Sequence, residues 1–237
     1  MLGLAGIAGL PSEARAIFIQ YTGTGTSAGV SVSASADFTT SAGKVVLTLQ
    51  NTTVHTADAG QLLTGIRFTL APNPITTGVL TAATAIPRVI AADGSYVDGT
   101  SQSILGTWES GISGGVYQLD FNPNAEFAIV GPADGETALT LGSYAGSNGS
   151  IAGNPGHNPF TAKSATFTLS SPQITAGTTI TSVEFIYNTG LSYVVPGTPS
   201  APPPPPPIPE PSTFGFGLAI LGACGTARRR KAGTPAV

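Results

Sequence analysis

The sequence predicts an all-β protein, an antiparallel β-sandwich of two packed sheets with about ten strands. Two features of its 237 residues predict this fold class. Only 9% of the residues are charged, whereas glycine (31) and proline (20) are abundant, and long exposed helices need more Glu, Lys and Arg than this. Short stretches also alternate apolar and polar residues, which places like side chains on one face of a sheet.

At the N-terminus, residues 1–16 (MLGLAGIAGLPSEARA) are expected to be the remnant of a secretory signal peptide. An apolar stretch at 2–10 precedes an A-x-A pattern at 14–16, the kind of site that signal peptidase cuts. No Lys or Arg precedes the apolar stretch, although such signals normally start with one. The alternative is an N-terminal strand or an irregular lead-in.

Residues 17–195 are expected to form one β-sandwich domain. In the clearest strand, VSVSASADF (30–38), Val32 and Phe38 share the apolar face while Asp37 lies on the other. The span 142–160, rich in Gly, Asn and Pro, is expected to be a long loop. The other strand candidates are KVVLTLQN (44–51), TGIRFTLA (64–71), GVYQLDFN (115–122), EFAIVG (126–131), SATFTLSS (164–171) and TITSVEFIYN (179–188).

Charge and cysteine content exclude several classes of function for this domain. Between residues 17 and 199 the sequence has four bases and ten acids, a net charge of −6. A surface so poor in Lys and Arg offers little to phosphate groups, so nucleic acid is not expected as a partner. The sole cysteine, Cys224, lies in the C-terminal apolar run, which leaves the domain without a disulfide, a cysteine-ligated zinc site or a cysteine nucleophile.

A proline-rich linker is expected at residues 196–208. The stretch PGTPSAPPPPPPIPEP (196–211) holds ten of the chain's twenty prolines, and the fixed φ of proline favours an extended polyproline II rod. Such a rod would act as a stiff spacer between the domain and the tail. The alternative is a ligand for the aromatic groove of a proline-recognition domain.

A single C-terminal transmembrane helix is expected after the linker. Fourteen uncharged residues, 214–227, precede the four cations Arg228, Arg229, Arg230 and Lys231. Cations next to a span prefer the cytoplasmic side and act as a membrane stop, so the β domain would lie outside. Fourteen residues give only about 21 Å of helix against a bilayer core of about 30 Å, so the span is marginal. An ordinary soluble helix would carry a polar face, which this run lacks.

The motif PEPST (209–213), the apolar run and the basic cluster together resemble the PEP-CTERM sorting signal. The resemblance implies that Pro209, Glu210 and Pro211 form the motif recognised by exosortase, a membrane enzyme that cuts near it. It covers residues 209–231, and 232–237 would be a C-terminal extension. The resemblance further implies an exported bacterial protein, transiently anchored in the inner membrane and then present at the cell surface or outside the cell.

The motif GISGG (111–115) is similar to the turn around a trypsin-like serine nucleophile. His55, Asp93 or Asp98, and Ser113 also follow the chain order of a catalytic triad. Ile112 stands where such enzymes carry an acid before the serine, and Gly-Ser-Gly clusters are typical of turns between strands. We therefore interpret the motif as a turn and expect no catalytic residues.

Two other patterns contain carboxylates that could serve in catalysis or in binding calcium. Asp120 and Glu184 lie on expected strands and could face one groove, as the paired carboxylates of a glycoside hydrolase do, or could simply point to solvent. The stretch AADGSYVDGTSQS (91–103) offers Asp93 and Asp98 as ligands for calcium, although an Asp-Gly hairpin turn explains it equally well. No other cofactor is expected.

The aromatic residues Trp108, Tyr117 and Tyr187, together with Tyr144, are candidates for stacking on sugar rings. The alternative is that they belong to the core. The sequence thus predicts an exported, non-catalytic surface or extracellular-matrix protein that exosortase sorts. The alternatives are a carbohydrate-binding module for extracellular polysaccharide and a hydrolase acting on cell-envelope polymers.

Overall fold

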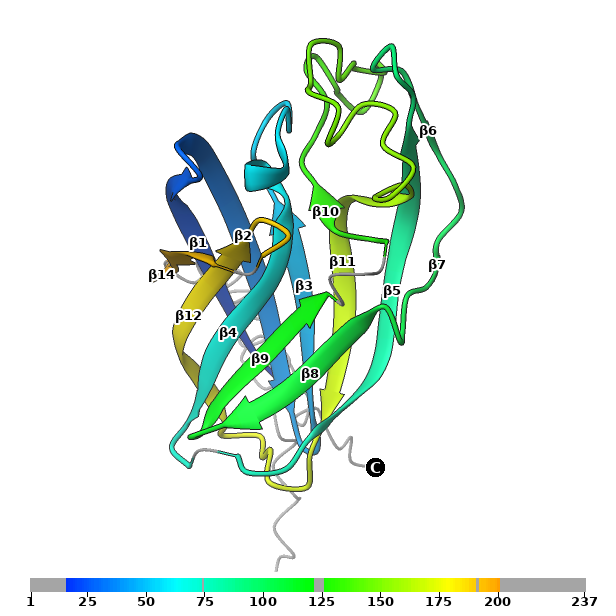
Figure 1. Ribbon diagram of the computed structural model, residues 1–237. Helices are drawn as coiled ribbons and strands as arrows, with labels where there is room; N and C mark the ends of the chain where they lie inside the picture. The colour runs from blue at the N-terminus through cyan, green and yellow to red at the C-terminus, as the bar shows by residue number, and fades with distance from the viewer. Residues whose placement is uncertain (1–15, 74, 122–125, 191, 201–237) are drawn as a thin grey trace, which may run out of the picture. The chain divides into compact units, whose positions relative to one another are not determined.

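All long elements of the computed structural model are β-strands, as the sequence predicts. The structure describes residues 16–73, 75–121, 126–190 and 192–200 (Figure 1). The one helical element in these residues is a 3-10 turn, η1 (Ala59–Gln61), which begins where Asp58 accepts a hydrogen bond from the backbone of Gly60. No helix of the described residues is long and apolar enough to cross a membrane.

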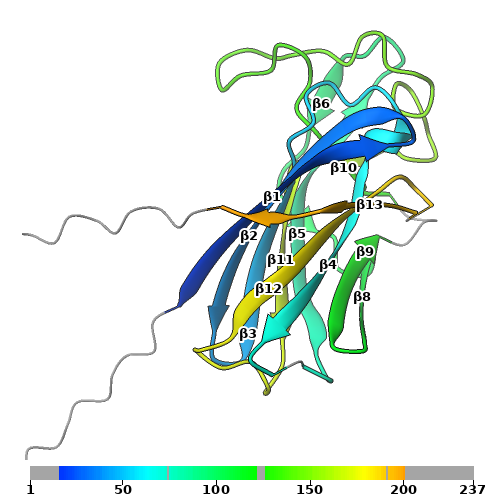
Figure 2. The same ribbon diagram turned by 90° about the vertical axis from the view of Figure 1, so that its left-hand side faces the viewer.

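Ten strands form two layers of five, and neighbours within each layer are antiparallel (Figures 1 and 2). The first layer has the order β5–β11–β3–β2–β1 and the second the order β8–β9–β4–β12–β13. The first layer contains β1 (Ile17–Ser27), β2 (Val30–Ser41), β3 (Lys44–Asn51), β5 (Val79–Ile90) and β11 (Phe160–Ser170). The second contains β4 (Leu63–Ala71), β8 (Trp108–Ser113), β9 (Val116–Phe121), β12 (Thr179–Tyr187) and β13 (Tyr193–Pro196).

A short strand joins the two layers, which corrects the prediction of two separate, wholly antiparallel sheets. β10 (Ile129–Val130) pairs antiparallel with β4 and parallel with β11, so the strands belong to one mixed sheet. A parallel pair needs a long connection, and residues 131–159, the crossover loop, provide it. The predicted loop at 142–160 is confirmed up to Pro159, whereas the predicted strand at 126–131 is shortened to β10.

Fourteen strands occur in the described residues instead of about ten, because pairs of two or three residues add to the count. β6 (Tyr96–Asp98) and β7 (Gln102–Ser103) pair with β5 at the edge of the first layer. β14 (Thr198–Pro199) pairs with β1, and the backbone of Ser200 bonds to Gln20. The start of the predicted linker at 196–208 therefore lies within the sheet.

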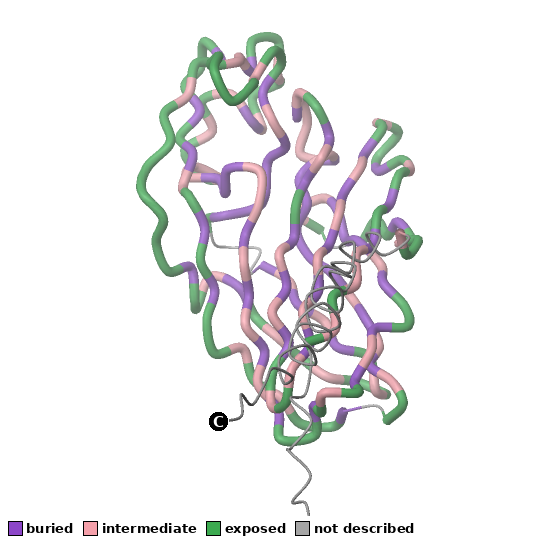
Figure 3. Tube along the Cα trace, turned by 180° about the vertical axis from the view of Figure 1, so that it is seen from behind, coloured by how far each residue is buried: buried purple, intermediate pink, exposed green. Residues whose placement is uncertain are grey.

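The core lies between the two layers, and Figure 3 shows buried and more exposed positions alternating along the strands. On β2, Val32, Ala34, Ala36 and Phe38 are buried, which confirms the predicted period of two. Phe38 contacts Phe68 on β4 with ring centroids 5.1 Å apart, so an aromatic contact links the layers.

Close packing of the layers explains why position 23 of β1 is a glycine. A Cβ atom at Gly23 would lie 2.7 Å from the ring of Phe185 on β12. On the same strand the Tyr21 hydroxyl donates to the carbonyl oxygen of Ile180 at 2.8 Å. The edge of the first layer thus touches the second, and a larger residue at position 23 would force them apart.

Candidate functional site

The outward face of the second layer is hollowed into a groove of about 620 Å³, which we call the outer groove. β8, β9, β4 and β12 line it, and the side chains that reach it include Glu109, Gln118, Arg67 and Glu184. These residues share one face because the register places Arg67 opposite both Gln118 and Glu184 in neighbouring strands.

Two hydrogen bonds and one ion pair connect the polar side chains of the outer groove across three strands. Arg67 Nε donates to Gln118 Oε1 at 2.7 Å, and Gln118 Nε2 donates to Asp120 Oδ2. On the other side, Arg67 Nη1 lies 3.9 Å from Glu184 Oε2. The result is a row of alternating charge and amide, Glu184–Arg67–Gln118–Asp120, in which each side chain orients the next.

Asp120 and Glu184, the predicted carboxylate pair, therefore line one groove. They lie on β9 and β12 with β4 between them, so about 10 Å separates their strands. Gln118 donates a hydrogen bond to Asp120, and Arg67, which bonds to Gln118, forms an ion pair with Glu184. This arrangement favours holding polar groups of a ligand over exchanging protons between two acids.

The structure corrects the prediction that Trp108, Tyr117 and Tyr187 stack on sugar rings. Their exposed fractions are 2%, 1% and 0%, so a sugar ring cannot reach them. Trp108 packs against Phe167 with ring centroids 4.8 Å apart and donates from Nε1 to the carbonyl oxygen of Phe127. Tyr144, the fourth candidate, is also fully buried. All four belong to the core.

The residues in triad order do not come together. Ser113 lines the outer groove on β8, whereas His55 lies next to Ser147, whose Oγ is 3.3 Å from Nε2 of the imidazole. The Ser147 hydroxyl also donates to the carbonyl oxygen of Thr56, so the imidazole is not placed to take its proton. GISGG forms the end of β8 and the turn into β9, as we interpreted it.

The predicted calcium ligands have other partners. Asp93 accepts from the backbone and hydroxyl of Ser95, in the turn that joins β5 to β6. Gly94 adopts a φ of +82° in this turn, which glycine tolerates best, so the Asp-Gly hairpin alternative is confirmed. Asp98 binds Arg88 through both oxygens. In the part of the chain that the structure describes, no three His, Cys, Asp or Glu side chains are grouped as a metal site.

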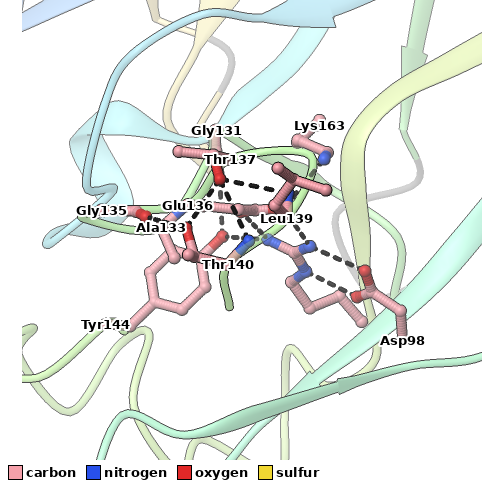
Figure 4. A network of polar contacts seen from close by, with 11 residues as sticks. Asp98, Gly131, Ala133, Gly135, Glu136, Thr137, Leu139, Thr140, Tyr144 and Lys163 are labelled. Carbon is pink, nitrogen blue, oxygen red and sulfur yellow. Dashed lines mark hydrogen bonds and ion pairs between the residues drawn. The ribbon is translucent and has the colours of Figure 1, made fainter. Parts of the chain in front are cut away.

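A buried ionic cluster, which the sequence did not predict, lies between β5, β6, β11 and the crossover loop (Figure 4). We call it the Arg88 cluster; it consists of Arg88, Asp98, Glu136, Tyr144 and Lys163. The Arg88 side chain is 0% exposed and forms two bonds to Asp98, at 2.6 and 2.7 Å, and two to Glu136, at 2.8 and 2.9 Å. Its remaining partner is the Tyr144 hydroxyl at 2.9 Å, and Lys163 Nζ lies 2.8 Å from Glu136.

The Arg88 cluster fixes the crossover loop to the sheet. The guanidinium lies 3.9 Å from the centre of the Tyr96 ring, which adds a cation–π contact. Two cations and two carboxylates cancel, so the buried charge is compensated. The Tyr144 hydroxyl continues the network to the carbonyl oxygen of Gly131, at the start of the loop. We assign the cluster a structural role because its charged groups form ion pairs and hydrogen bonds with one another.

Glu136 makes this cluster sensitive to acid. Burial alone raises the pKa of its carboxyl group, but bonds from Arg88, Lys163 and the backbone of Ala133 outweigh burial and lower the pKa from 4.5 to about 2. A carboxylate with a depressed pKa stabilises the fold above its ordinary pKa, and this contribution is lost as the pH falls toward the folded value.

We therefore expect the difference in unfolding free energy between the wild type and Glu136→Gln to be largest near neutral pH. It should shrink between about pH 4.5 and pH 2, because the wild-type carboxylate becomes protonated on unfolding in this range. Urea titrations at a series of pH values measure the difference. A difference that stays constant down to pH 2 would contradict the role of Glu136.

The predicted sorting motif Pro209, Glu210 and Pro211, the transmembrane run and the membrane stop at 228–231 lie outside the described residues, as does nearly all of the predicted signal remnant. No family model matches the sequence, and a search of curated proteins returns no match either. The geometry of the β unit, which comprises the described residues between 16 and 200, and the order of the motifs in the tail are therefore the basis for assigning a function.

Proposed function

We propose that this chain is an exported, non-catalytic surface or extracellular-matrix protein that exosortase sorts through residues 209–231. The order of the tail carries the proposal: a PEP motif, then an apolar run at 214–227, then four consecutive cations. Each part has a physical task, because the run can enter the membrane and the cations stop it from passing through. Exosortase and the inner membrane are the partners that this order implies.

The β unit suits a protein that works outside the cell without catalysis. Its two facing layers, joined by β10, support the assignment of a β-sandwich, a common fold of surface domains. The buried charges of the Arg88 cluster compensate one another, and the carboxylates of the outer groove bond to neighbouring side chains. These features support a scaffold that presents a surface.

The proline-rich segment before the motif completes the proposed arrangement. Residues 202–207 are six consecutive prolines, which favour a stiff and extended backbone. At about 3.1 Å per residue they extend about 19 Å, enough to keep a folded domain clear of the lipid headgroups. The PEP motif would then stand at the outer surface of the inner membrane, where a membrane enzyme can reach it.

Replacing Pro209, Glu210 and Pro211 together by alanine tests the sorting motif. We expect the variant to remain in the membrane fraction of its own host, because the apolar run and the cations persist while the recognised motif is lost. The matched control replaces three linker prolines, 203–205, by alanine and should still leave the membrane. Quantitative immunoblots of membrane and medium measure both, and equal release of the two variants would refute the proposal.

A further inference from the structure

We infer that the outer groove binds a neutral polysaccharide, with Arg67, Asp120 and Glu184 holding sugar hydroxyl groups. This inference goes beyond the sorting proposal and does not depend on it, because it rests on residues of the β unit alone. It also replaces the aromatic residues that the sequence indicated as sugar contacts with a row of polar ones.

The outer groove has the size and form of a binding site. Its volume of about 620 Å³ lies within the range of about 300–1,000 Å³ that ligand sites occupy. Several residues of β8 that line the groove are small, so their side chains do not obstruct it. A Cβ atom at Gly111 would meet nothing within 4 Å, and Ser113 follows on the same face. The space above the row of polar side chains is therefore open to an extended chain.

The polar row is arranged before a ligand arrives. Gln118 uses its amide oxygen on Arg67 and its amide nitrogen on Asp120, so its role is to orient both neighbours. Arg67 is also drawn toward Glu184 on the opposite side, where the two side chains lie 3.9 Å apart. Side chains whose rotamers are set in advance lose less entropy on binding, which raises affinity.

The unused bonding capacity of this row fits sugar hydroxyls. A guanidinium has five N–H donors, and Nε of Arg67 uses one of them on Gln118. A carboxylate offers about four lone-pair sites, so Asp120 and Glu184 keep acceptors beyond the bonds described. Neighbouring hydroxyls of a sugar both donate and accept, so one pair can bond a carboxylate and the guanidinium together.

Charge selects a neutral polymer. Glu109, Asp120 and Glu184 line the groove with one cation, Arg67, which gives a local charge of −2 and repels uronic acids and sulfated sugars. Uncharged hydroxyl groups do not meet this penalty.

Affinity electrophoresis of the full chain through gels that contain glucomannan, galactan or dextran tests the inference, with polygalacturonate as the anionic polymer. We expect at least one neutral polymer to retard the wild type and polygalacturonate not to. Asp120→Asn and Glu184→Gln should each weaken the retarding interaction about tenfold, the change that corresponds to one hydrogen bond to a charged group. Gly111→Leu should abolish it by filling the groove.

Asp37→Asn is the matched control, because Asp37 lies on the outward face of the other layer and accepts a hydrogen bond from Gln20 on the neighbouring strand. It should bind like the wild type, and the melting temperatures of all four variants show whether each is folded. The inference is overturned if no neutral polymer retards the wild type, if the groove variants bind like Asp37→Asn, or if polygalacturonate binds as tightly. None of these results bears on sorting, which the tail variants test.

Discussion

Replacing Arg88 by alanine is expected to lower the free energy of unfolding by about 3–5 kcal/mol, the usual effect of removing one partner from a buried ion pair. The substitution leaves Glu136, whose side chain is 7% exposed, without the guanidinium that compensates its charge. It also removes three bonds that tie the crossover loop to β5 and two that tie β5 to β6. Urea unfolding followed by circular dichroism measures the loss.

Arg67→Ala is the control, since Arg67 is 34% exposed and lies 3.9 Å from its partner Glu184. A surface pair of this kind contributes about 0–1 kcal/mol, so this variant should remain close to the wild type. Equal losses for the two arginines would mean that the Arg88 cluster does not hold the loop as described.

Replacing Trp108 by alanine is expected to cost about 3–5 kcal/mol, because a large side chain 2% exposed leaves a cavity between the layers. Trp108→Phe keeps most of the volume and should cost about 1–3 kcal/mol, since the carbonyl of Phe127 loses the indole donor and keeps only the bond from the Thr161 hydroxyl. Leu139→Ala is the control at a side chain that is 96% exposed and should change little.

Trp108 also provides a test of where a ligand binds. Trp108 is the sole tryptophan, so the intrinsic tryptophan fluorescence of the chain comes from it. We expect a blue-shifted emission that does not change when a bound polysaccharide saturates the outer groove, because the indole faces the core. A spectral shift on binding, together with a stable Trp108→Ala variant, would restore the stacking hypothesis.

Period-two patterns predicted the all-β fold and many of its strands. β2 is the clearest example, because its alternation of Val32 to Phe38 with polar residues is unbroken and its buried face follows directly. β5 was harder to recognise: Pro87 lies within it, and the register against β11 shifts between Ala85 and Pro87, so its alternation is interrupted. The two residues of β10 carry too little pattern to show that they join the layers.

The Arg88 cluster could not be predicted, because its members come from four separate segments that only the fold brings together. The scarcity of bases in the β unit was the one available signal, since a lone arginine among the apolar residues of AIPRVI (85–90) needs a carboxylate. The burial of Tyr117 was predictable: it alternates in phase with Leu119 and Phe121, both buried. The same phase places Gln118 and Asp120 outside, where the outer groove lies.

The intact mass of the extracellular protein tests the proposed sorting most directly. We expect the mature chain recovered from its own host to end near Pro209 to Pro211, without Cys224 and without the cations at 228–231. A strain that lacks exosortase should instead keep the uncut chain in its membrane fraction. Full-length protein in the medium, with the four cations still attached, or the same cut form from both strains, would contradict the proposal.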